Sequence, residues 1–243
     1  VLTYPDSSTM ESPGSGNCHT NRIFDLLLEL RKKFRYNQTA MNVVNSASFW
    51  EESYRSGRTG WDLGMPTPVF RRLAESNQFQ PGKMLVICAG RGYDARMFAR
   101  LGFQVTAVDF AEDAIKEMQS LLDPDLSMEV IQADIFDLPA FMNEEFEYIL
   151  EYTCFCAIDP QRRAEYIESV SSLLKPGGYY IALAFPIGQR TGGPPFLVSP
   201  DELIDPLGDQ GYDLVSREIP HDSVPGREGI EELLVLKKKA GFF

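Results

Sequence analysis

The chain has 243 residues, 44% of them hydrophobic, and a formal net charge of -12. This length can bury the core of one α/β domain. No apolar run approaches the roughly 20 residues that a membrane span needs, since the longest, at 179–185, has the length of a strand. The acidic balance argues against nucleic acid, because phosphate binding requires clustered Lys and Arg. We expect a soluble, cytoplasmic protein that binds neither a membrane nor nucleic acid.

The four cysteines, Cys18, Cys88, Cys154 and Cys156, show neither a CxxC pair nor a regular framework. Three of them lie in apolar segments typical of strands, where a free cysteine packs as a small hydrophobe. This usage indicates a reducing compartment. The chain has only two histidines, so a histidine metal site or a Ser-His-Asp triad is not expected, and we predict no metal.

Helices are predicted for the N-terminal region after a polar start. Residues 1–20 are rich in Ser, Pro, Gly and Asn, which predicts disorder, and they show no signal-peptide pattern. From residue 21 apolar residues recur at helical spacing, and a second helix is predicted near 41–54. The turn-rich segment 57–66 then leads into a helix that begins at a proline and ends near residue 75.

From residue 83 strands and helices alternate. The predicted strands cover 83–88, 104–109, 128–132, 145–151, 179–185, 212–218 and 232–238, and the predicted helices cover 93–101, 111–122, 161–174 and 200–210. This order implies a mainly parallel sheet covered on both faces, with the last two strands antiparallel because no helix separates them. We predict a doubly wound, seven-stranded α/β fold. Residues 21–243 would form one domain, with 21–78 as a helical cover and 79–243 as a Rossmann-like core.

Unusual residues follow the predicted strands at their carboxyl ends, where doubly wound sheets bind ligands. The first strand leads into Gly90 and Gly92, which allow a sharp turn and a close approach of a ligand. The second ends at Asp109, whose carboxylate could accept hydrogen bonds from a ribose. The third leads into Asp134-Ile135, a polar group beside an apolar one, as an adenine requires. The fourth ends at Glu151-Tyr152.

Two other interpretations of these strand ends stay open. The run 90–95 fits G-x-G-x-x-A, and Asp109 follows at about the spacing of a dinucleotide fingerprint, so a nicotinamide-dependent oxidoreductase is a rival. The segments 133–135 and 174–178 have no evident task in such an enzyme. Each glycine turn or aspartate could also be purely structural, because Asp commonly ends strands and caps helices. Their occurrence at successive strand ends favours a nucleotide-like site.

Together with several longer segments, these motifs resemble a known enzyme family. The chain is similar to class I S-adenosylmethionine-dependent methyltransferases of the thiopurine methyltransferase-like group, and within it to plant-type halide, thiocyanate and thiol methyltransferases. The resemblance runs from about residue 45 to the end. The Trp-Asp-x-Gly segment at 61–64 and the Phe-Cys-Ala-Ile segment at 155–158 are far more specific than the glycine loop. The other segments that carry it are 49–50, 65–68, 89–94, 109, 134–135, 159–163 and 191–196.

The resemblance implies S-adenosylmethionine as cofactor and a set of residues that bind it. In the cover these are Trp50, Tyr54, Trp61 and Gly64, and on the sheet side they are Gly90, Gly92, Asp109, Phe110, Asp134, Ile135 and Glu151. An electron-rich ring face attracts a sulfonium cation, which supports the aromatic residues independently; both tryptophans could instead simply pack the cover onto the core. The family usually has glycine where Cys88 stands, so the turn there could be slightly remodelled or the cofactor displaced.

The acceptor expected from the resemblance is a small thiol, thiocyanate or halide. In-line displacement needs the nucleophile and the methyl carbon about 3–3.5 Å apart, but no covalent intermediate. Such acceptors are anions or easily become anions, so no strong general base is required. The expected aromatic walls of the acceptor pocket are Phe49, Tyr152, Phe155, Phe185 and Phe196. Tyr152 is the expected catalytic residue, because its hydroxyl could orient the acceptor.

Other functions and the assembly state stay open. An N- or O-methyltransferase of a small-molecule biosynthetic pathway is an alternative within the same class. A non-catalytic cofactor-binding module is an alternative from another class. The loop 191–198 is expected to shape the acceptor pocket, and the chain is expected to be a monomer or a weak dimer.

Overall fold

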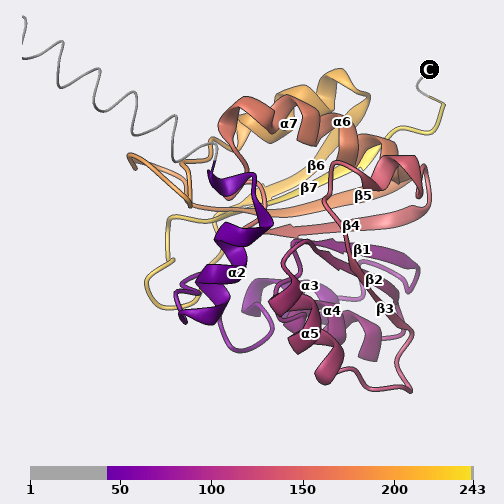
Figure 1. Ribbon diagram of the computed structural model, residues 1–243. Helices are drawn as coiled ribbons and strands as arrows, with labels where there is room; N and C mark the ends of the chain where they lie inside the picture. Colours follow the sequence, from indigo (N-terminus) through magenta and orange to yellow (C-terminus); the bar gives the residue numbers. More distant parts are fainter. Residues whose placement is uncertain (1–42, 242–243) are drawn as a thin grey trace, which may run out of the picture. The chain divides into compact units, whose positions relative to one another are not determined.

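This computed structural model describes residues 43–241 of the chain. A seven-stranded sheet forms its centre (Figure 1). The strand order is β3-β2-β1-β4-β5-β7-β6, and all pairs are parallel except those that β7 makes with β5 and β6. The predicted doubly wound sheet with antiparallel final strands is confirmed. The strands are β1 (Lys83–Ile87), β2 (Gln104–Asp109), β3 (Met128–Gln132), β4 (Phe146–Tyr152), β5 (Leu174–Ala184), β6 (Tyr212–Glu218) and β7 (Glu232–Lys238).

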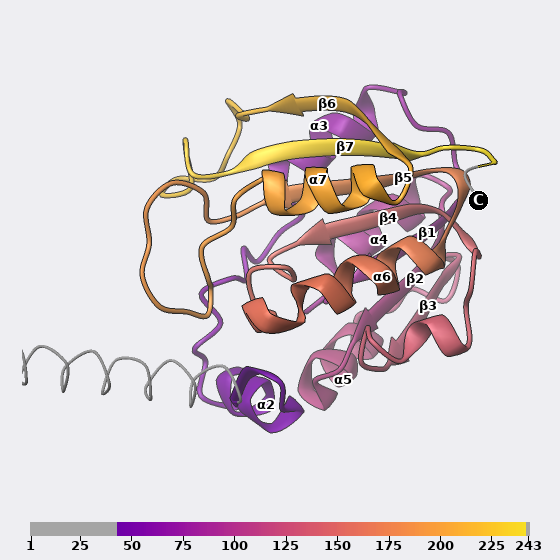
Figure 2. The ribbon, with the colours of Figure 1, turned by 90° about the horizontal axis from the view of Figure 1, so that it is seen from above.

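Helices cover both faces of the sheet (Figures 1 and 2). Helices α6 and α7 lie on one face, and α3, α4 and α5 lie on the other. The helices are α2 (Ala47–Arg55), α3 (Pro68–Glu75), α4 (Tyr93–Arg100), α5 (Glu112–Ser120), α6 (Arg163–Leu173) and α7 (Asp201–Asp209), with 3-10 turns η1 (Leu138–Ala140) and η2 (Pro160–Arg162).

Alternating side chains of the strands form two separate apolar cores. In β1, Leu85 and Ile87 join the core beneath α6 and α7, whereas Met84 and Val86 join the core beneath α3, α4 and α5. The same alternation continues in the other central strands, because successive side chains of a strand point to opposite faces. Burial on both faces explains why these strands read as continuous apolar runs.

One strand begins earlier than predicted. We predicted a turn at 174–178 and a strand from 179, but β5 begins at Leu174, directly after α6. Gly177 has a φ of 84°, and the register against β4 shifts between Phe146 and Tyr148. The predicted turn is therefore absorbed into the strand as an irregularity of the pairing.

The neighbouring strands β1 and β4 are parallel, and successive strands are added on opposite sides of this pair. From β1 the chain proceeds to β2 and β3, and from β4 it proceeds to β5 on the other side. The carboxyl ends of β1 and β4 therefore mark the switch point at which such sheets bind ligands.

Some of the predictions fall outside the described residues. These are the disorder at 1–20, the helix that starts at residue 21, and Cys18. The domain boundaries at 20 and 78 stay predictions. Over residues 43–241 no helix combines the length and the apolar character that a membrane crossing demands.

Candidate active site

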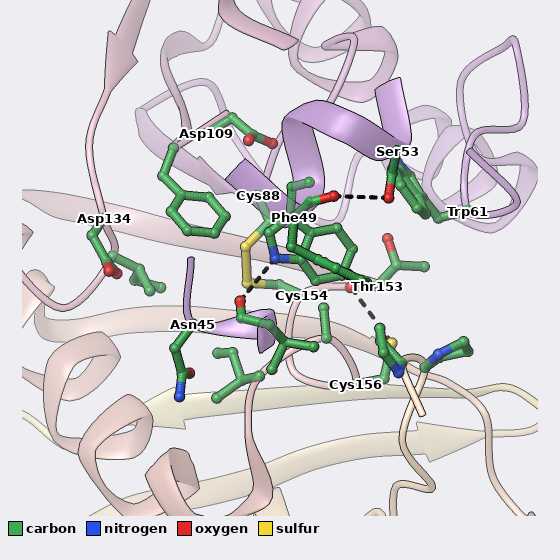
Figure 3. Close-up of a pocket in the computed structure, with 18 of the residues that line it drawn as sticks. Asn45, Phe49, Ser53, Trp61, Cys88, Asp109, Asp134, Thr153, Cys154 and Cys156 are labelled. Carbon is green, nitrogen blue, oxygen red and sulfur yellow. Dashed lines mark hydrogen bonds between the residues drawn. A yellow bond between two sulfur atoms is a disulfide. The ribbon is translucent and has the colours of Figure 1, made fainter. Parts of the chain in front are cut away.

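A cavity of about 530 Å³ opens at the carboxyl ends of the strands, beside the switch point (Figure 3). This volume lies within the range of about 300–1,000 Å³ typical of small-molecule sites. One part of its wall, which we call the strand-end half, consists of Cys88, Val108, Asp109, Phe110, Ala133, Asp134, Ile135 and Phe136. The remaining wall, the loop half, comes from segments 44–61, 153–162 and 185–195.

Asp109 anchors the glycine turn in the strand-end half. Its carboxylate accepts hydrogen bonds from the Gly90 amide at 2.9 Å and from the Ala111 amide at 3.0 Å. Burial raises the pKa of Asp109, and the backbone amides oppose that rise. Each carboxylate oxygen keeps a second lone pair, so Asp109 can brace the turn and still accept a hydrogen bond from a ligand in the cavity.

Phe110, Asp134 and Ile135 also face the cavity, as the resemblance implied. Asp134 accepts a hydrogen bond from the Phe136 amide at 3.1 Å through one carboxylate oxygen. Beside it, the Arg162 guanidinium lies 3.5 Å from the centre of the Phe136 ring. Polar and apolar groups are thus interleaved at this end of the cavity.

The two glycines of the turn differ in their surroundings. Gly90 has a φ of 56° and lines a smaller cavity of about 70 Å³, which shares Tyr54, Trp61, Cys88 and Thr153 with the larger one. A Cβ at Gly92 would lie 2.6 Å from Cγ of Met118 in α5. Gly92 lines neither of these cavities, so it permits close packing of α4 on α5.

Aromatic residues of the cover form one wall of the loop half. Trp61 contacts Trp50 and Tyr54 edge to face, with ring centroids 5.4 and 5.6 Å apart. Trp50 donates to the Val44 carbonyl at 2.9 Å, and Phe49 packs edge to face on Trp50. All four rings line the cavity, so the cover encloses it with electron-rich surfaces.

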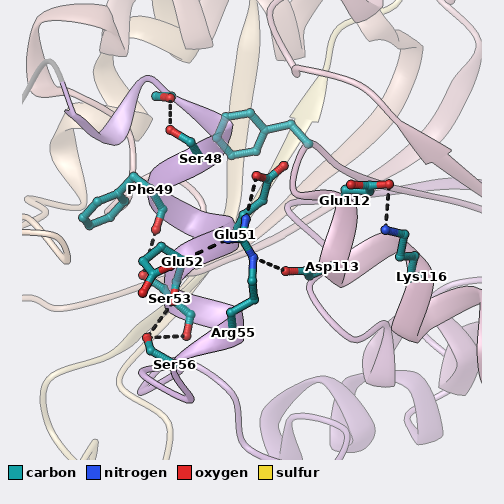
Figure 4. Close-up of polar contacts among 12 residues, drawn as sticks. Ser48, Phe49, Glu51, Glu52, Ser53, Arg55, Ser56, Glu112, Asp113 and Lys116 are labelled. Atoms are coloured by element: carbon teal, nitrogen blue, oxygen red, sulfur yellow. Dashed lines mark hydrogen bonds and ion pairs between the residues drawn. The ribbon is translucent and has the colours of Figure 1, made fainter.

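Polar contacts tie helix α2 of the cover to the core (Figure 4). The Arg55 guanidinium lies between Glu51 of its own helix and Asp113 of α5, with N–O distances of 3.2 Å to each. A second tie is the hydrogen bond of 3.3 Å from Asn45 to Asp159. These links cross long stretches of sequence, and the sequence pattern alone did not indicate them.

Cys88 and Cys154 form a disulfide between the ends of β1 and β4, in the wall of the cavity (Figure 3). The expectation of a free thiol at each of these positions is therefore wrong. The expectation rested on the absence of a spacing motif, but the two strands are neighbours in the sheet and bring residues distant in sequence together. Cys156 is a buried free thiol, and burial raises its pKa.

Five predicted site residues line neither cavity, contrary to expectation: Gly92 and Phe196, together with Glu151, Phe155 and Gly64. Glu151 is 1% exposed and accepts hydrogen bonds from the Cys154 and Phe155 amides at 2.9 Å. Burial raises the pKa of Glu151 to about 7. Phe155 is 1% exposed and packs on Tyr166. The exposed Gly64 lies in the cover but lines neither cavity; its amide donates to Asp62.

The two remaining walls predicted from the C-terminal half differ. Phe185 lines the cavity as predicted. Phe196 is buried and does not line it, and the neighbouring Pro194 and Pro195 provide the wall instead. The loop 191–198 therefore contributes to the cavity through its prolines. The order of strands and helices and the family resemblance predict where such a loop lies. They do not predict which of its side chains points into the cavity.

Tyr152 lines the smaller cavity, and its hydroxyl is engaged by charged partners. It hydrogen-bonds to Glu231 and accepts from the Arg227 guanidinium. Burial and the Glu231 charge raise the pKa of Tyr152. Arg227 also donates to the carbonyls of Gly60 and Trp61, at 3.1 Å each. The catalytic role of Tyr152 stays a prediction. Its contacts with Glu231 and Arg227 hold its hydroxyl in place.

Sequence reasoning missed several cations of the site. Arg58, Arg162 and Arg190 line the cavity, and Arg227 joins the cover to the sheet. Arg58 and Arg190 are exposed at its rim, and within residues 43–241 neither forms an ion pair with a carboxylate. The sequence offered one signal for these cations. In so acidic a chain, arginines lie in or beside the segments 57–66 and 191–198.

Known proteins resemble this chain in sequence and in fold. A probable thiol methyltransferase 2 of Arabidopsis thaliana is 37% identical over 205 residues, which cover 82% of this chain and 88% of the relative. Thiocyanate methyltransferase 1 of Brassica oleracea is 33% identical over 78% of this chain and 84% of its own length.

Solved structures share the architecture at lower identity. A 1,6-didemethyltoxoflavin-N1-methyltransferase of Burkholderia thailandensis superposes over 98% of both chains, with a TM-score of 0.62 and 17% identity. At that identity the likeness shows the fold alone. Residues 45–224 match the family of thiopurine S-methyltransferases. The chain belongs to that family of S-adenosylmethionine-dependent methyltransferases and is a methyltransferase enzyme.

Proposed function

We propose that the protein transfers a methyl group from S-adenosylmethionine to a small anionic sulfur acceptor, such as a thiolate or thiocyanate. The names of the relatives support a sulfur acceptor, since they denote thiol and thiocyanate methyltransferases. Two features of the cavity support it independently: among the described residues that line the loop half none can act as a general base, and cations lie at the rim.

The residues of the strand-end half fit the adenosine part of this cofactor. Asp109 and Asp134 would accept hydrogen bonds from its hydroxyl and amino groups, with Phe110 and Ile135 as the apolar contacts. The positive φ at Gly90 leaves room beside the smaller cavity for the amino-acid part. The rings of Trp50, Tyr54 and Trp61 would face the sulfonium, to which electron-rich rings are attracted. When bound, the cofactor supplies the methyl group and the leaving sulfur.

The acceptor would occupy the loop half, where no described lining residue can serve as a base near neutral pH. The titratable groups of this half are Tyr54, Cys156 and the arginines. Burial raises the pKa of Tyr54 and of Cys156, so both hold their protons. An acceptor must therefore arrive as an anion or lose its proton readily, which a thiol with a pKa of about 8.5 can do.

The rim arginines favour the same class of acceptor. Arg58 in the cover and Arg190 in the loop after β5 place two positive charges at the cavity mouth. Guanidinium groups attract an anion and lower the pKa of a nearby thiol. Enclosure by aromatic residues would then strip water from the thiolate and leave its sulfur exposed to the methyl group.

A methyl-transfer assay with the full chain tests this function. The acceptor panel holds thiocyanate, iodide, hydrosulfide, an alkyl thiol, an aryl thiol, a thiopurine and a neutral N-heterocycle. We expect release of S-adenosylhomocysteine with the sulfur anions, and a rate with the thiols that rises as pH approaches their pKa. Turnover with the heterocycle alone would contradict the proposal and support the N-methyltransferase alternative. Binding of S-adenosylhomocysteine without any turnover would support the non-catalytic module.

A further inference from the structure

We propose that Cys88 and Cys154 form a thiol-exchange site in the cavity wall, at which a small thiolate opens the disulfide and becomes attached to Cys88. The disulfide joins the chain just after β1 to the chain just after β4. These strand ends form the switch point of the sheet, where the cavity lies. The bond is therefore part of the ligand site and is not a surface staple.

The position of Cys88 makes its sulfur the one open to attack. Cys88 is partly exposed and lines both cavities, whereas Cys154 borders only the larger one, is 0% exposed and belongs to the core beneath α6. Exchange proceeds at the sulfur that the incoming thiolate can reach. A thiolate that enters from the cavity thus meets Cys88 first.

The backbone at both ends of the disulfide is strained, which supports a functional role for this position. Cys88 has a φ of 46°, in the left-handed region that glycine adopts with least strain. Thr153, directly before Cys154, has a φ of 60°. Strained residues of this kind gather at functional sites, where other interactions hold them. Here Cys88 is one half of the disulfide, Thr153 precedes the other half, and both line the cavity.

The exchange needs no partner beyond the thiol itself. The thiolate sulfur bonds to Cys88 Sγ, the Cys88–Cys154 bond breaks, and the electron pair stays on Cys154 Sγ, which takes a proton from water. A second thiolate attacks the outer sulfur of the mixed disulfide, and the bond from that sulfur to Cys88 Sγ breaks. The electron pair stays on Cys88 Sγ, which takes a proton from water, and a small symmetric disulfide is released. Two thiols are thereby oxidised and the protein pair is reduced. A thiol acceptor, the class inferred above, can supply both.

The mixed disulfide has a consequence for methyl transfer, and this step rests on the proposed function. The larger and the smaller cavity adjoin at Cys88. A substituent on its sulfur would fill the space through which cofactor and acceptor must meet. We expect the adduct to block methyl transfer until a second thiol removes it.

Peptide mapping of the full chain tests the exchange. The wild-type protein is mixed with 2-mercaptoethanol, quenched in acid, alkylated with iodoacetamide and digested. We expect the mercaptoethanol adduct on Cys88 and the alkyl group on Cys154. In Cys154→Ala the second sulfur is missing, so treatment with hydroxyethyl disulfide should leave a lasting adduct on Cys88. Cys88→Gly, which suits the backbone there, should form no adduct, and Cys156→Ser should carry the same adduct on Cys88 as the wild type.

Three results would overturn the exchange site. They are an adduct on Cys156 in place of Cys88, an adduct on Cys154, and alkylation of Cys88 and Cys154 before any thiol is added. Cys156 is a demanding control, because it also lines the cavity but is buried with a raised pKa.

Binding and activity measurements test the block. Adduct-bearing Cys154→Ala should bind S-adenosylhomocysteine or turn over a thiol at least about tenfold less well than the same variant without adduct. A phosphine reductant should restore both. Equal binding and equal turnover with and without the adduct would overturn the block. If the adduct-free proteins methylate no sulfur acceptor, the proposed function fails, yet peptide mapping still decides the exchange.

Discussion

The two halves of the cavity differ in how their residues are held. In the strand-end half, Asp109 ends β2 and Asp134 follows β3, and both accept hydrogen bonds from backbone amides close by in sequence or in the neighbouring turn. The loop half is joined by contacts between distant segments, such as Arg227 with the carbonyls of Gly60 and Trp61. Local rules therefore build the first half, and long-range contacts build the second.

Arg227→Met should produce the largest effect, by breaking the loop half. Arg227 is 8% exposed and Glu231 is 1% exposed, so the change removes two carbonyl contacts and takes the neighbouring cation away from a buried carboxylate. We expect the unfolding free energy in urea to fall by about 3 kcal/mol, because uncompensated buried charges are costly.

A double variant separates the two causes of this loss. Arg227→Met with Glu231→Leu removes the orphan charge and should recover about half of the lost stability. It should not recover binding of a thiol acceptor, because Gly60 and Trp61 stay untethered. Wild-type stability in the single variant would show that the loop half does not depend on this contact.

Asp109→Ala probes the strand-end half with the next largest effect. Hydrogen bonds to a charged group contribute about 1.5–3 kcal/mol, so S-adenosylhomocysteine should bind roughly 10- to 150-fold more weakly by calorimetry. The exposed Glu129→Ala in β3 loses the same charge and should bind as wild type. Undiminished affinity in Asp109→Ala would show that this carboxylate only braces the Gly90 turn.

The contrast between the halves also explains what could be predicted from the sequence. Strand period and strand-end chemistry predicted the sheet and the positions of Asp109, Asp134 and Ile135 in the wall, and the family resemblance added Phe110. These features depend on a few neighbouring residues. The Cys88–Cys154 disulfide could not be predicted in the same way, because it follows from the pairing of β1 with β4.

Side-chain direction within a loop was the other failure. Phe155 and Phe196 were expected to face the acceptor because aromatic residues suit such a wall, yet both are buried in the core. Arg58 and Arg190 line the cavity without belonging to a motif. Composition cannot decide which way a loop residue turns, since that depends on the elements packed around it.

Glu151→Gln gives an intermediate effect that depends on pH. Burial raises the Glu151 pKa from 4.5 to about 7, so the folded protein keeps a proton that the unfolded chain releases over this range. The stability that this group contributes is complete below pH 4.5 and is lost as pH rises to about 7. Glutamine keeps an oxygen for the Cys154 and Phe155 amides without titrating. Relative to wild type, the variant should gain about 3 kcal/mol between the two ends of the range.

Urea unfolding of both proteins at several pH values checks this gain, with the exposed Glu129→Gln as control. A difference between Glu151→Gln and wild type that stays constant with pH would mean that Glu151 titrates normally. That outcome would also contradict the burial of Glu151 beneath the Cys154 and Phe155 amides, because a normally titrating carboxyl would have to reach solvent or the cavity.

Arg58→Ala and Arg190→Ala give the smallest effects and test the charge of the acceptor. Each change removes an exposed positive charge from the rim, so KM for thiocyanate should rise about fivefold, equivalent to about 1 kcal/mol, with kcat nearly unchanged. Added salt should shrink the difference from wild type, because it screens exposed charges. Arg100→Ala alters the net charge equally from the exposed end of α4 and should leave KM unchanged.

The decisive comparison is between acceptors and not between variants alone. A loss of general cavity shape would raise KM for every acceptor, whereas a loss of positive potential raises it only for anions. A neutral thiol at a pH well below its pKa should therefore bind the rim variants as well as it binds wild type. If both acceptors weaken together, the arginines act by shaping the loop half, and the preference for anions must come from the missing base alone.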